Sequence, residues 1–173
     1  MSDVAITTET PVKELFIKMV VAAWDASTGQ VNKLFDELSD AQFAAETAPG
    51  RNTGIYLLGH LTAVTDRMMP LLGFGERLYP QLDPVFLTSP DKSGLEMPPL
   101  AELKKNWKEA NKRLSESIAK TTPDEWLSKH TAVSAEDFAK EPQRNKLNVL
   151  INRTNHQSTH YGQLIYLKAK ANQ

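Results

Sequence analysis

Two histidines near the C-terminus, His156 and His160, are spaced four residues apart. Residues at this spacing lie one above the other on the same face of an α-helix. Val149 and Leu167 fall on the same side, so apolar residues frame the pair and it is expected to point toward other helices. Two stacked imidazoles suit zinc, nickel, copper or iron. A catalytic or closed site needs at least a third ligand, which must come from elsewhere in the chain.

His60 is the candidate for that third ligand. It lies within an apolar stripe, flanked at helical spacing by Leu57 and Val64. Three neutral imidazoles from two helices could hold one ion and leave a position open for water or substrate. Sequence spacing does not bring His60 to the pair, however. The alternative is that the histidines are hydrogen-bonded residues of the core.

Several other side chains are predicted to surround such a site. The outer ring nitrogens of the histidines need hydrogen-bond acceptors, and tyrosines and arginines nearby are suited to line the approach and to hold an anionic substrate. The candidate acceptors are Asn152, Gln163, Asp66 and backbone carbonyls, and the candidate pocket residues are Tyr56, Tyr161, Arg67 and Arg153.

The composition excludes several classes of function. The chain has 173 residues, and its 20 basic and 21 acidic residues give a net charge of −1. This balance lacks the basic surface of a nucleic-acid-binding protein. The absence of cysteine rules out disulfides, zinc–thiolate sites and cysteine nucleophiles.

The chain is expected to be cytoplasmic and not to enter a membrane. Residues 1–10 are polar and lack the basic start of a signal peptide. The most apolar window, 16–24, is interrupted by Lys18 and is too short to cross a bilayer.

Four long helical patterns predict an all-α protein, a four-helix bundle. They span residues 15–38, 53–72, 98–118 and 145–170, and Ser39 and Thr122 each begin a capping box. A long connection, 73–99, separates the second and third helices, and residues 128–143 are expected to form a loop. We expect a flexible tail over residues 1–10 and a single domain over residues 11–173.

The histidine motifs resemble those of the DinB/YfiT-like family of metalloenzymes. The resemblance is carried by Gly59-His60-Leu61 and by His156-x-x-x-His160-x-Gly162-Gln163, and also by Ala23-Trp24, Leu34, Leu38, Ser39-Asp40 and Phe43. It implies a four-helix bundle, frequently a homodimer, with a divalent metal held by the three histidines. Some relatives are transferases or isomerases that use bacillithiol, mycothiol or glutathione.

These observations favour a metal-dependent enzyme that acts on a small molecule. The expected ion is zinc or nickel, and the reaction class is transfer to, or isomerisation with, an external low-molecular-weight thiol that the metal activates. Two alternatives remain at this point. One is a hydrolase that activates water on the metal, and the other is a non-catalytic dimer that binds a metal or a small ligand.

Overall fold

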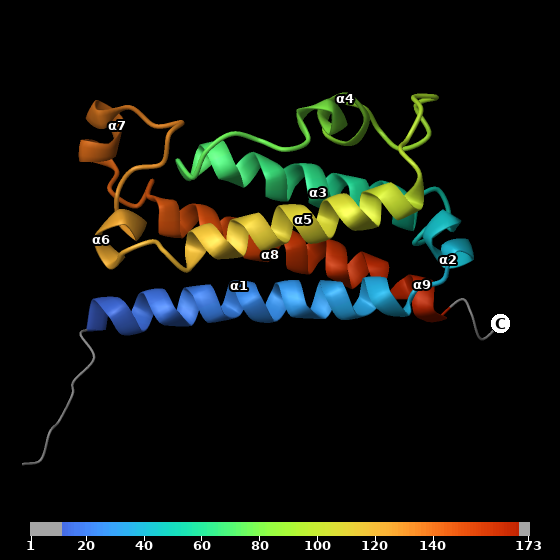
Figure 1. Ribbon diagram of the computed structural model, residues 1–173, viewed down its shortest axis with the longest axis horizontal. Helices are drawn as coiled ribbons and strands as arrows, with labels where there is room; N and C mark the ends of the chain where they lie inside the picture. The colour runs from blue at the N-terminus through green and yellow to red at the C-terminus, as the bar shows by residue number, and fades with distance from the viewer. Residues whose placement is uncertain (1–11, 170–173) are drawn as a thin grey trace, which may run out of the picture.

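Four long helices lie side by side in the computed structural model, which describes residues 12–169 (Figure 1). They are α1 (Val12–Glu37), α3 (Gly54–Leu71), α5 (Leu100–Ile118) and α8 (Lys146–Leu164). The short helices are α2 (Asp40–Ala44), η1 (Pro80–Leu82), α4 (Asp83–Phe86), α6 (Pro123–Trp126), α7 (Ala135–Lys140) and α9 (Tyr166–Ala169). No β-strand occurs between residues 12 and 169, so the predicted all-α bundle is confirmed. The expected tail, 1–10, lies outside the described residues.

The helices do not simply alternate in direction. Followed by colour in Figure 1, α1 and α8 run one way, whereas α3 and α5 both run the other way. The connection 72–99 makes this possible because it returns along the bundle and carries η1 and α4 over the outer side of α3. As a result α3 is covered on nearly every side.

The two predicted capping boxes are present and begin short helices at opposite ends of the bundle. The Ser39 hydroxyl accepts a hydrogen bond from the Gln42 N–H, and the Ser39 N–H donates to the Gln42 side chain. Thr122 and Glu125 exchange the same pair of bonds before α6. Each box satisfies N–H groups that the first turn of a helix leaves free.

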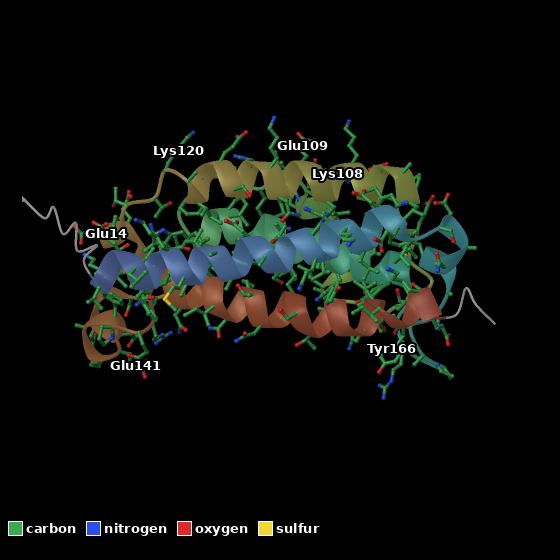
Figure 2. All side chains as sticks on the ribbon, turned by 90° about the horizontal axis from the view of Figure 1, so that it is seen from below. Glu14, Lys108, Glu109, Lys120, Glu141 and Tyr166 are labelled. Carbon is green, nitrogen blue, oxygen red and sulfur yellow. The ribbon has the colours of Figure 1, made fainter. Side chains whose placement is uncertain are left out.

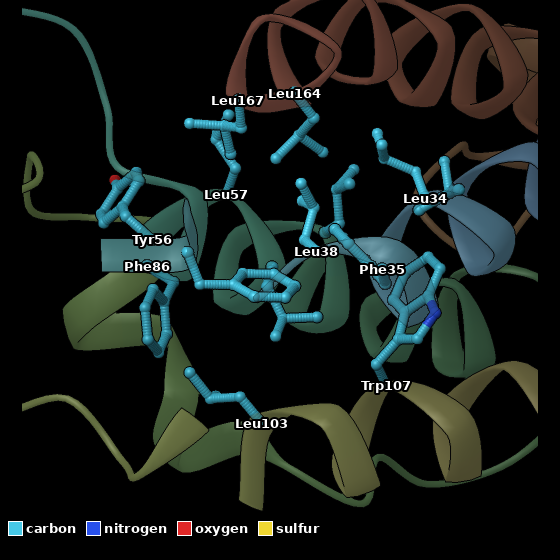
Figure 3. Packing of buried hydrophobic residues seen from close by; sticks show 14 of the residues in the cluster. Leu34, Phe35, Leu38, Tyr56, Leu57, Phe86, Leu103, Trp107, Leu164 and Leu167 are labelled. Carbon is cyan, nitrogen blue, oxygen red and sulfur yellow. The ribbon is translucent and has the colours of Figure 1, made fainter. Parts of the chain in front are cut away.

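The core consists of two hydrophobic clusters, one toward each end of the bundle, and α3 contributes to both. Leu57 and Leu58 are fully buried, and Trp107 packs edge-on against Phe35 with ring centroids 5.5 Å apart (Figure 3). Charged side chains such as Lys108 and Lys120 project from the outer surface (Figure 2). This separation of apolar and charged faces follows the 3.6-residue period that the sequence shows.

The structure differs from the sequence-based prediction in three segments. Residues 128–143, expected to be a loop, contain α7. The last helix, predicted to reach residue 170, ends at Leu164, and α9 follows after a break at Ile165. The connection 73–99 has helical turns, η1 and α4, whose four or fewer residues are too short to produce a recognisable period.

Ion pairs fasten this connection to α3. Arg77 donates to the carboxylates of Asp66 and Asp83, and the backbone N–H groups of Leu78 and Tyr79 also donate to Asp66. Asp66 is therefore an anchor for the connection, and the prediction that it accepts a hydrogen bond from a site histidine is wrong.

Candidate metal centre

Three histidines from two helices converge on one point between α3 and α8. His60 Nε2 and His160 Nε2 each lie 3.1 Å from His156 Nε2. The three side chains are half-buried, and they form the single group of metal-ligating residues found in the described part of the chain. The structure thus brings together the residues that sequence spacing could not connect.

These separations match a single transition-metal ion. With metal–nitrogen bonds of about 2.0–2.1 Å, two ligand nitrogens are about 3.3 Å apart at a tetrahedral angle and about 2.9 Å apart at a right angle. The observed 3.1 Å lies between these two values. Three such ligands occupy one side of an ion and leave the other side free.

The outer nitrogens of two histidines have acceptors that determine the tautomer. His60 Nδ1 donates to the carbonyl oxygen of Phe86 at 2.8 Å, and His160 Nδ1 donates to the Gln163 side-chain oxygen at 2.8 Å. Because both acceptors are oxygens without a proton, the hydrogen must sit on Nδ1. The Nε2 atoms of His60 and His160 are then unprotonated and aim their lone pairs at His156.

A neutral triad cannot satisfy all of these lone pairs. If His156 carries its proton on Nε2, it can donate to His60 or to His160 but not to both. If it carries the proton on Nδ1, that buried nitrogen has no hydrogen-bond partner among residues 12–169. A cation among the three Nε2 atoms removes the repulsion between the lone pairs, so this donor set fits a bound metal ion.

Burial also favours the neutral form of His60 and His156, and metal-binding imidazoles must be neutral. Loss of solvent lowers the pKa of His156 to about 4, with a further contribution from the charges of His160 and His60. Burial likewise lowers the pKa of His60, although the hydrogen bond to the Phe86 carbonyl raises it in part. At neutral pH these two histidines therefore do not have to release protons before they bind a metal ion.

Gly59 explains how α4 comes close enough to support His60. A Cβ atom at position 59 would lie 2.3 Å from the ring of Phe86. The glycine allows that ring to pack on α3, beside Tyr56 (Figure 3), and the packing places the Phe86 carbonyl against His60. Phe86 has no signal in the sequence, because its contribution is a backbone atom in a segment without periodicity.

A buried polar contact sets the position of α8 on α1. Gln157, the neighbour of His156, donates to the hydroxyls of Ser27 at 3.0 Å and Thr28 at 3.1 Å. Gln157 is 2% exposed, so breaking these bonds would leave a buried amide unsatisfied. The contact holds the helix in the register that points His156 and His160 toward α3.

The other predicted site residues divide into those that meet the triad and those that do not. The Tyr56 ring stacks on His60 with centroids 6.4 Å apart, while its hydroxyl donates to the Ser89 carbonyl. Asn152 is exposed and makes no hydrogen bond to the histidines in the described structure. Tyr161 lines a groove beside α1 rather than the triad. The two arginines, Arg67 and Arg153, lie along the same α3–α8 seam.

The sequence also assigns the family. A family model described as the DinB superfamily matches residues 23–164, and the chain therefore belongs to this superfamily. Its members are often metal-binding. No curated protein matches the chain significantly. None of the helices between residues 12 and 169 combines the length and the hydropathy that a bilayer crossing requires.

Proposed function

We propose that the protein binds one divalent transition-metal ion, zinc or nickel, through His60, His156 and His160. The observation that carries this proposal is the convergence of the three Nε2 atoms. In His60 and His160, the hydrogen bond made by Nδ1 leaves Nε2 unprotonated. Histidine-only ligation suits these ions, and three protein ligands are the pattern of a catalytic rather than a structural centre.

The proposed reaction is thiol-dependent transfer or isomerisation of a small molecule. A divalent ion in the triad would lower the pKa of a coordinated thiol and make it nucleophilic at neutral pH. The chain has no cysteine, so the thiol must come from a soluble cofactor. The residues of the chain then orient and bind: Phe86 and Gln163 hold the imidazoles, and the Tyr56 ring shields one side of His60.

The metal site is tested by the metal content of the protein purified without a histidine tag. Wild type is expected to hold about one ion per chain, and the double variant His156→Ala/His160→Ala is expected to hold none. His130→Ala is the matched control, because His130 is the one histidine of the four outside the triad. Equal metal content in all three proteins, or no metal and no thermal shift with added zinc or nickel, would refute the site.

Thiol binding is tested separately on protein loaded with cobalt(II). A coordinated thiolate gives an intense near-ultraviolet charge-transfer band, which we expect with glutathione or a simpler thiol. If no thiol produces the band while ester hydrolysis depends on the triad, the thiol reaction is refuted and a hydrolase takes its place.

We also propose that the protein forms a homodimer through the outer face of α1. Three large apolar side chains, Leu15, Phe16 and Met19, are 51–61% exposed there, and exposed alanines continue the same face. A two-fold axis would place this face against its own copy. Light scattering should show that Phe16→Glu is monomeric, whereas Lys120→Glu on another surface stays dimeric. A monomeric wild type would refute the proposal.

A further inference from the structure

A groove lies on the seam between α3 and α8, toward the C-terminal end of α3. It has a volume of about 420 Å³. The Thr131 hydroxyl donates to the carbonyls at the end of α3 and so closes one side of it. The residues that line the groove are Arg67, Pro70, Leu71, Arg77, Thr131 and Arg153. Three of the six are arginines.

Two of these arginines are neutralised by carboxylates. Arg67 donates twice to Asp83, at 3.0 and 2.7 Å, and Arg77 binds both Asp83 and Asp66. Arg153 has neither an ion pair nor a hydrogen bond within residues 12–169. The groove therefore has three guanidinium groups against two carboxylates, and the unbalanced positive charge belongs to Arg153.

The positive charge of Arg153 is partly removed from solvent, which is unfavourable for a cation. Arg153 is half-buried, and its pKa is lowered by burial and by the charge of Arg67. A guanidinium stays protonated at neutral pH even so. Keeping a partly desolvated cation without a partner costs free energy that an anion would offset.

Arg153 also lies in reach of the proposed metal ligands. It precedes His156 by three residues and His160 by seven, which places all three on one face of α8. The rise of the helix puts Arg153 about 5–10 Å along the axis from the two histidines. Its charge acts on both His60 and His156.

We propose that Arg153 forms an anion subsite for a carboxylate or phosphate group of a small ligand whose other end reaches the histidine triad. This inference rests on the proposed function. It assigns to that site an anionic substrate or cofactor whose charged group is a few covalent bonds from the end that reaches the triad. It also distinguishes the two arginines, because Arg67 is already occupied by Asp83 and Arg153 is free to bind.

The anion subsite is tested first without metal, by the melting temperature in inorganic phosphate at constant ionic strength. A ligand that binds only the native state raises the melting temperature. We expect this rise in wild type and in Arg144→Met, an arginine paired with Glu141, and its loss in Arg153→Met. A rise of equal size in Arg153→Met, or no rise in any of the three, would overturn the subsite.

The link to the triad is tested on cobalt(II)-loaded protein with two probes of equal length, 3-mercaptopropionate and 3-mercaptopropan-1-ol. One charge-assisted hydrogen bond corresponds to a preference for the carboxylate of about tenfold or more. Arg153→Met should abolish this preference while the alcohol binds as before. Equal binding of both probes to wild type would overturn the inference. Failure of metal loading, in contrast, would count against the proposed function alone, since the phosphate response does not need the ion.

Discussion

The contact between Gly59 and Phe86 makes the sharpest prediction about the metal centre. In Gly59→Ala the new Cβ would lie 2.3–2.5 Å from three atoms of the Phe86 ring, whereas carbon atoms normally rest about 3.5–4.0 Å apart. The ring must therefore retreat by more than about 1 Å. Because the ring and the carbonyl belong to one residue, the 2.8 Å hydrogen bond to His60 is expected to lengthen beyond bonding range.

Two quantities should change. Overpacking of this kind costs about 1–3 kcal/mol of the free energy of unfolding. Loss of the acceptor that orients a metal-binding histidine weakens metal affinity by about 10–100-fold. Urea unfolding of the metal-free protein measures the first quantity, and zinc competition with a chromophoric chelator measures the second.

Gly162 supplies the matched control, because it lies in α8 two residues after His160 and a Cβ there meets no atom within 4 Å. Gly162→Ala should gain about 0.5–1 kcal/mol from the lower backbone entropy of alanine in the unfolded chain. It should also keep the zinc affinity of wild type. If the two variants have the same stability and the same affinity, then the Phe86 carbonyl does not orient His60.

Three further predictions concern the surroundings of the site and the ends of the bundle. Gln163→Ala removes the acceptor of His160 and should weaken zinc binding by about 10–100-fold in the same competition assay, with unchanged circular dichroism. The Arg77 hydrogen bonds lower the pKa of Asp83, so the unfolded chain takes up this proton first as the pH falls. The stabilisation is thus complete above the unfolded pKa of 3.8 and is lost as the pH falls through the lower folded value; Asp83→Asn should flatten the decline of melting temperature below about pH 4, and an unchanged slope would contradict this. Thr122→Ala removes the N-cap of α6 and should lower the free energy of unfolding in urea by about 0.5–2 kcal/mol. Equal stability of the variant and wild type would contradict this.

Periodic segments were predictable because their own pattern determines them. The helix expected over 53–72 is observed as Gly54–Leu71, and both capping boxes lie where their residue types indicated. In these segments the apolar period, the cap and the turn residues agree with one another. The all-α class followed directly from that agreement.

The parts that escaped prediction depend on contacts between distant segments. Nothing near Asp66 indicates that Arg77 and two backbone N–H groups will occupy its carboxylate. Arg67 and Arg153 were equivalent candidates in the sequence, and only the fold shows that Asp83 pairs with the first. The same holds for Phe86, since a backbone carbonyl has no residue-type signature.

The histidine triad spans most of the chain, and this has a consequence for how the protein acquires its site. His60 and His156 are 96 residues apart in sequence, yet their Nε2 atoms are 3.1 Å apart. An ion bound to both would act as a removable cross-link, and closing a loop of this length restricts the unfolded chain by about 4–5 kcal/mol on the scale known for disulfides. Until α8 docks, His60 has no partner and α8 alone offers two imidazoles. Tight metal binding would therefore require that α8 is packed against α3.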